Sequence, residues 1–273
     1  HAVRLAEEFF ISSSSRGRST VSEPQDLRSD RLASEPLVRS VPGEISASRL
    51  KKLETALTGL AEDPDPRVRF HLALAAREFR SKESVMAFLR LVERGKDDAW
   101  QLRAVLCSLG NRAWPFLHAL VWNHRQWAAA PTGEQAQFLE EVAKLIGIRN
   151  ERAETAQLRW LIFNLGTGPA RVSAAAMALL TGFSDGLAQE NQIWWKLPNP
   201  TAEELRLSDS QPPSDLSELL AEAAVAAAQS KDVSMQTRVR AIRVLGNSPA
   251  VFGARVLHAM LAEDNPTEVQ AAT

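Results

Sequence analysis

Residues 63–75 read Asp63-Pro-Asp-Pro-Arg-Val-Arg-Phe-His-Leu-Ala-Leu-Ala75, and this stretch decides the fold. A small capping residue comes first, an aliphatic residue follows five positions later, and an arginine comes directly after it. The same outline returns at Asp97, 34 residues further on, with Leu102 and Arg103 in the matching places. A period of about 35 residues is typical of proteins built from repeated helix pairs.

Weaker copies of this outline continue along the chain. Ser234 and Asp264 begin two of them, and Arg240 keeps the arginine position in the first. Between the strong and weak copies, the period falls on Thr132 and Thr167, and threonine can cap a helix. Thr132 also has a glutamine three residues on, which is the signature of a capping box. We therefore expect the second helices of the pairs to start near residues 66, 98, 133, 168, 234 and 266.

The stretches between these copies have the pattern of partner helices. Residues 48–61 carry leucines at spacings of three and four, which is the stripe of an amphipathic helix. Similar patterns occupy residues 81–93, 113–126, 152–165, 215–229 and 249–263. Such a helix pair is apolar on more than one face and has to stack on its neighbours to form a core. The sequence therefore predicts an all-α fold, more finely a right-handed α-solenoid.

Two stretches interrupt the repeats. Residues 11–47 are rich in Ser, Arg, Glu and Pro, a composition that predicts a mobile surface insertion. Residues 184–214 hold two adjacent tryptophans and several prolines, which predicts an irregular crossing between two helix stacks. The expected organisation is the end of a repeat helix, the insertion, a first set of repeats, the crossing and a second set, at residues 1–10, 11–47, 48–183, 184–214 and 215–273. The first helix starts part-way and the last repeat is short, so we expect an array truncated at both ends.

Charge and composition narrow the classes of function. Lys and Arg number 32 against 33 Asp and Glu, so no global positive field draws the chain onto nucleic acid or an anionic membrane. No stretch approaches the roughly 18 apolar residues that a membrane-spanning helix needs, which predicts no membrane insertion by this segment. The single cysteine, Cys107, excludes an internal disulfide and a multi-cysteine zinc site. It lies in an apolar run, which predicts a buried thiol.

Sequence motifs give little support to catalysis. Neither a Gly-x-Gly-x-x-Gly fingerprint nor a P-loop occurs. No histidine precedes a glutamate, and His118 and His124 are six positions apart, which places them on different faces of a helix. We therefore predict that the chain is not an enzyme and has no catalytic, cofactor-binding or metal-ligating residue.

The outline of residues 63–75 resembles the second helix of a HEAT repeat. In that family the aspartate caps the turn, and the arginine pairs with aspartate in a ladder between repeats. The resemblance implies a structural ladder made of Asp63, Arg69, Asp97, Arg103, Arg240 and Asp264. If those pairs are largely buried, replacing Arg103 by alanine should cost about 1–3 kcal/mol of stability.

A narrower resemblance rests on three blocks, residues 66–75, 98–109 and 138–147. In that order they resemble the HEAT segment of large bacterial fusion proteins, the membrane-bound dehydrogenases of planctomycete type. In those proteins a quinoprotein-like β-propeller precedes the repeats and a cytochrome c domain follows. The resemblance implies a periplasmic or cell-envelope location and a redox parent whose catalysis lies outside this chain.

The predicted function is a non-catalytic protein-interaction or domain-spacing scaffold, with other domains of a parent chain or a separate protein as partner. One alternative is an accessory module of an oxidoreductase. Another alternative is nucleic-acid binding on a concave face lined by arginines. Pairing of the same arginines with aspartates in the ladder is the competing explanation for their presence. The arginines of that alternative are Arg67, Arg69, Arg103, Arg171, Arg238 and Arg240.

Tryptophans supply the candidate contact residues. Trp194 and Trp195 lie in the predicted crossing, and we expect one ring to anchor the crossing and the other to contact a partner. The other tryptophans lie in helical stretches and are expected to fill the space between repeats. These are Trp100, Trp114, Trp122, Trp127 and Trp160.

Overall fold

The structure is a computed structural model that describes residues 47–79, 83–166, 173–205, 213–248, 250–261 and 266–273. Helices make up most of these ranges, and they contain no strand, which confirms the predicted all-α fold. The predicted repeat helix at residues 1–10 lies outside the described residues, and so does nearly all of the predicted insertion at 11–47.

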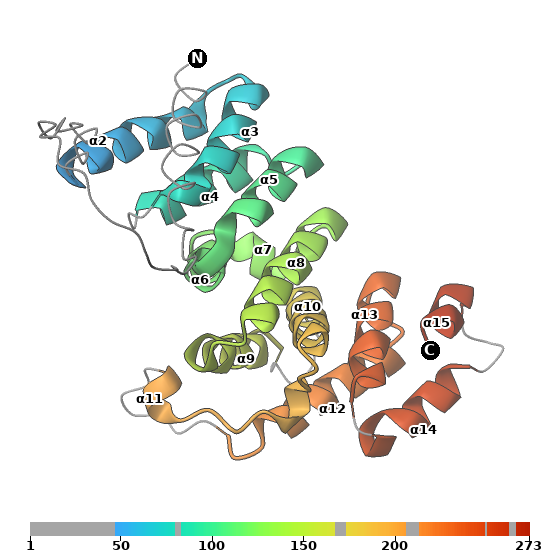
Figure 1. Cartoon of the computed structure of the whole chain (residues 1–273). Helices are drawn as coiled ribbons and strands as arrows, with labels where there is room; N and C mark the ends of the chain where they lie inside the picture. The colour runs from blue at the N-terminus through green and yellow to red at the C-terminus, as the bar shows by residue number, and fades with distance from the viewer. Residues whose placement is uncertain (1–46, 80–82, 167–172, 206–212, 249, 262–265) are drawn as a thin grey trace, which may run out of the picture.

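The helices lie in two rows (Figure 1). The first row holds α2 (Ala47–Thr58), α4 (Glu83–Arg94), α6 (Ala113–Asn123), α9 (Arg152–Gly166), α12 (Leu216–Gln229) and α14 (Ala250–Met260). The second row holds α3 (Pro66–Ala75), α5 (Ala99–Leu109), α8 (Gly133–Arg149), α10 (Ala174–Gln189), α13 (Met235–Gly246) and α15 (Thr267–Ala272). Each helix of the second row contacts the next one in that row. One cluster of buried apolar side chains extends from Leu57 in α2 to Val269 in α15.

Shorter elements connect these helices. They are η1 (Gly59–Glu62), η2 (Ala76–Glu78), η3 (Gly110–Arg112), α7 (Arg125–Ala129), η4 (Trp194–Lys196) and α11 (Ala202–Leu205). The last two lie in the predicted crossing. That crossing begins later than expected, because α10 continues as a regular helix to Gln189.

Helix caps follow the predicted positions closely but not always the predicted residue. Thr132 and Gln135 form the expected capping box at the start of α8, and Ser234 caps α13. Asp65, rather than Asp63, caps α3, and its carboxylate accepts a hydrogen bond from the Arg67 amide at 2.9 Å.

At α5 the cap is Asp98 rather than Asp97. Thr167 lies outside the described residues, and α10 starts later than predicted, at Ala174 with Ser173 as its cap. The repeat outline therefore locates the turn before each second helix, while the capping side chain can lie one or two positions further on.

Helices α8 and α10 pack with their backbones in contact. A Cβ atom on Gly182 would overlap the carbonyl oxygen of Glu140, and one on Gly186 would overlap that of Lys144. From the other helix, a Cβ on Gly147 would come within 2.6 Å of the Phe183 carbonyl oxygen. Only glycine allows so close an approach of two helices.

Candidate functional site

The two adjacent tryptophans of the crossing lie in different environments. Trp194 is 1% exposed and belongs to the apolar core, and its indole Nε1 has no hydrogen-bond partner among the described residues. Trp195 is half-buried, and the ammonium group of Lys196 lies 5.2 Å from the centre of the Trp195 ring. One ring is therefore an anchor, while the other reaches the surface.

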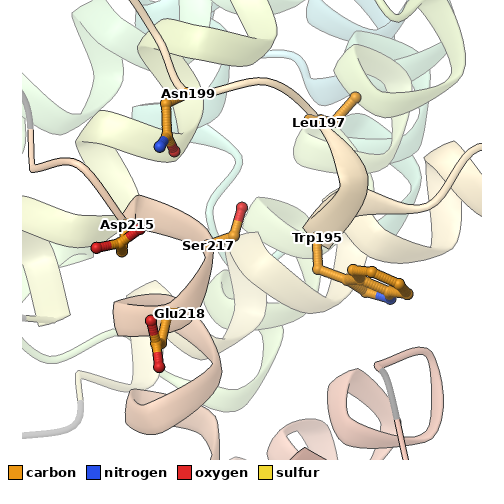
Figure 2. A pocket seen from close by; sticks show the side chains of 6 residues that line it. All are labelled: Trp195, Leu197, Asn199, Asp215, Ser217 and Glu218. Carbon is orange, nitrogen blue, oxygen red and sulfur yellow. The ribbon is translucent and has the colours of Figure 1, made fainter.

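Trp195 forms part of the wall of two cavities. The first has a volume of about 280 Å³ and lies between the crossing and the start of α12 (Figure 2). Its lining residues are Trp195, Leu197, Asn199, Asp215, Ser217 and Glu218. The second has a volume of about 260 Å³ and is lined by both tryptophans, by the end of α10 and by the end of α13. The same residue thus lines two small cavities.

A buried arginine forms a hydrogen bond with one of the residues that line the first cavity. Arg159 in α9 is 2% exposed and donates to the Pro198 carbonyl oxygen at 2.8 Å and to the Ser217 hydroxyl at 2.7 Å. It therefore ties α9 to the crossing and to α12. Burial lowers the pKa of its guanidinium to about 10, so the group remains charged at neutral pH. In the part of the chain that the structure describes, no carboxylate forms an ion pair with it.

Residues Gly182, Ser184 and Gly186 spell a Gly-x-Ser-x-Gly motif that sequence reasoning overlooked. In serine hydrolases this motif forms a sharp turn between a strand and a helix, which exposes the serine. Here it lies inside α10 with both glycines against α8. Ser184 is 2% exposed, and its hydroxyl accepts a hydrogen bond from the side-chain amide nitrogen of Asn247 at 3.1 Å. The motif serves helix packing and does not present a nucleophile.

Asp63 and Arg69, two of the predicted ladder residues, do not form a carboxylate–guanidinium pair with each other. Arg69 donates to the backbone carbonyl oxygen of Asp63 at 2.7 Å and to the side chain of Gln101 at 3.3 Å. The Asp63 carboxylate instead accepts from the amide of Asp65 at 2.8 Å. Arg69 thus links α3 to α5, as a ladder would, but through the side-chain amide oxygen of Gln101 and not through a carboxylate.

The remaining ladder residues are spread over different parts of the fold. Within the described ranges, no ion pair joins Asp63 or Asp97 to Arg69 or Arg103. Arg240 forms its ion pair with Glu140 of α8, at 2.8 Å, and Asp264 lies outside the described residues. Among the ladder residues that the structure describes, no Asp–Arg ion pair is found, and the place of Asp264 in such a ladder stays a prediction.

Arg103 is an exposed side chain, and its guanidinium carbon lies 5.9 Å from the ring centre of Trp100. Because it holds no buried partner, we expect Arg103→Ala to change the free energy of unfolding by less than about 0.5 kcal/mol. This expected change is smaller than the loss of about 1–3 kcal/mol that a buried Asp–Arg pair would imply for the same variant. Chemical denaturation of the variant beside the unmodified chain measures the difference, and a loss above about 1 kcal/mol would contradict the exposed position.

Three of the five described arginines of the nucleic-acid alternative form hydrogen bonds or ion pairs within the fold. Arg69 and Arg240 hold the partners described above, and Arg238 is 7% exposed and donates to the Ala228 carbonyl oxygen at 3.2 Å. Arg171 lies outside the described residues. Of this set, the structure places Arg67 and Arg103 as exposed side chains.

Two tryptophans and the cysteine were predicted to be buried and are exposed instead. Trp100 is 71% exposed and Trp122 is 63% exposed, whereas Trp127 is buried as expected. Cys107 is also exposed. In α5, Trp100, Arg103 and Cys107 are spaced three and four apart, so they share one face, and that face points away from the core.

That exposed face borders the largest hollow of the described cavities, which we call the α5–α8 groove. It has a volume of about 470 Å³. Its lining residues from α5 are Ala99, Leu102, Arg103, Leu106 and Cys107, and those from α8 are Glu134, Gln137, Phe138 and Glu141. Sequence reasoning missed this groove, because the pattern of one helix does not reveal how far the next helix stands from it.

The described helices give no sign of two other kinds of site. None of them is long and apolar enough to cross a lipid bilayer. In the same ranges, no group of three or more His, Cys, Asp and Glu side chains is arranged to hold a metal ion.

No protein-family model, no curated protein and no solved structure matches this chain.

Proposed function

We propose that this chain is a non-catalytic protein-interaction scaffold, built as an α-solenoid of HEAT-type helix pairs. The two rows of helices support this arrangement, and so do the starts of α3, α5, α8, α13 and α15, five of the six predicted positions. Stacked helix pairs give a rigid, extended surface on which binding requires no catalytic group. The partner is a protein domain, either of a larger parent chain or a separate molecule. In a redox parent, catalysis would lie in domains outside this chain.

The half-exposed ring of Trp195 carries this proposal. It projects from a segment that buried Trp194 and Arg159 fix to the core, and it lines two cavities. A tryptophan held rigidly beside hollows is a common anchor of protein interfaces, because little side-chain entropy is lost when a partner covers it. Irregular segments on a rigid scaffold are also where binding residues concentrate.

We expect Trp195→Ala to weaken association with the protein partner while the melting temperature stays nearly unchanged. The neighbouring change Trp194→Ala should instead destabilise the fold by about 3–5 kcal/mol, because it empties a core position. The experiment captures partners of the tagged chain from its source cells, quantifies them by mass spectrometry and measures melting of each variant. Capture that is unchanged by Trp195→Ala would contradict the contact role of this ring.

A further inference from the structure

The floor of the α5–α8 groove is apolar. Leu102 and Phe138 form this floor and are 5% and 3% exposed, whereas Leu106 is half-buried higher on the wall. The packing differs on the other side of α8, where α10 lies with its backbone in contact. The face of α8 toward α5 borders a cavity, whereas its face toward α10 has backbone contacts that leave no space for a Cβ atom at the three glycines.

Carboxylates line one rim of this groove. Glu134 and Glu141 are exposed residues of α8, one on either side of Phe138 along the helix. They are seven residues apart, or about 10 Å along the axis, and so lie on the same face. Neither forms an ion pair within the described ranges. Glu140 on the same helix differs, because its carboxylate pairs with Arg240 at 2.8 Å and with Arg243 at 2.9 Å.

The opposite rim carries one cation, the exposed side chain of Arg103. Arg103 lies with its guanidinium over Trp100, and this indole is 71% exposed. The lining of the groove therefore holds two carboxylates and one cation, so its excess charge is negative, and these groups flank an apolar floor. Such a surface repels the phosphates of a nucleic acid and attracts a ligand with cationic and apolar groups together.

We infer that the α5–α8 groove binds an extended segment of a partner protein with the pattern basic-x-apolar-x-basic. Alternate side chains of an extended segment lie on one face, so the two basic residues and the apolar one all point toward the groove. The apolar side chain enters between Leu102 and Phe138, and the basic side chains reach Glu134 and Glu141. The outer residues of this pattern are about 13 Å apart, whereas the two glutamates are about 10 Å apart along the helix. Lysine and arginine side chains are long and flexible enough to cover this difference. This inference rests on the proposed scaffold function and names a second contact, distant in sequence from Trp195.

Cys107 provides the readout, because it is the chain's single cysteine and lies in the groove. Random seven-residue peptides displayed on phage are selected against the full chain. The enriched peptides are then made synthetically and labelled for fluorescence anisotropy. We expect them to carry the basic-x-apolar-x-basic pattern, and to slow alkylation of Cys107 by iodoacetamide about fivefold or more when bound in excess.

The double variant Glu134→Gln and Glu141→Gln should weaken binding of these peptides about tenfold, with an unchanged melting temperature, because it removes the charges and keeps the shape. Glu222→Gln, an exposed change on α12, is the matched control and should leave affinity unchanged. Selection of no peptide, selection of peptides without basic residues, or equal binding by the double variant would overturn the inference. Those outcomes leave the Trp195 experiment unaffected, so a failure of the groove is distinguishable from a failure of the scaffold function.

Discussion

Replacing Gly182 by alanine is expected to lower the free energy of unfolding by about 3 kcal/mol or more, or to prevent folding. The added methyl group would overlap the carbonyl oxygen of Glu140, which belongs to the backbone of α8. A side chain could rotate away, but a helix backbone cannot, so α8 and α10 would have to separate. That separation opens the core between the two halves of the chain. Urea denaturation followed by circular dichroism measures the loss.

Gly246→Ala is the matched control, since Gly246 ends α13 and a Cβ atom there meets nothing within 4 Å. Alanine has the higher helix propensity, so this change should be neutral or stabilise by up to about 1 kcal/mol. Similar losses for the two variants would show that the α8–α10 contact is not as close as the structure has it.

Arg159→Ala is expected to have the second largest effect, a loss of about 3–5 kcal/mol. The change leaves a cavity where a long buried side chain was, and it removes the hydrogen bonds to the Pro198 carbonyl oxygen and the Ser217 hydroxyl. The lost contacts are those that join α9 to the crossing and to α12. The crossing should also loosen, which faster proteolysis after Lys196 would report.

The control for this change lies in the same helix. The Arg152 side chain is 68% exposed and pairs with Glu204 of α11 at the surface. Exposed ion pairs contribute little, so Arg152→Ala should cost less than about 1 kcal/mol. If both arginine variants lost equal stability, the burial of Arg159 would not be the cause.

The positions of the helices could be predicted from the sequence to a large extent. The outline at residues 63–75 and its copies predicted the turns before α3, α5, α8 and α13 to within a residue. This succeeds because caps and apolar periodicity are local properties that each helix carries in its own residues. The predicted start of α10 was wrong by several residues, since this helix starts at Ala174 with Ser173 as its cap.

The faces of the helices were harder to predict. Cys107 and Trp100 lie in an apolar stretch of α5, and their exposure depends on where α8 packs, which the α5 sequence does not contain. The partners of the arginines were also out of reach. Arg240 pairs with Glu140, 100 residues away in sequence, and no local pattern connects the two. Contacts between elements distant in sequence determine the candidate sites, so these sites became visible only in the folded chain.

The glycine contact between α8 and α10 has a mechanical consequence. Two helices whose backbones touch cannot slide or tilt without a clash, so this junction transmits a bending force as one stiff body. The junction between α5 and α8 has free volume and fewer such constraints. Strain applied along the array would therefore concentrate between α5 and α8, and the part of the chain before this junction would pivot on the part that follows it.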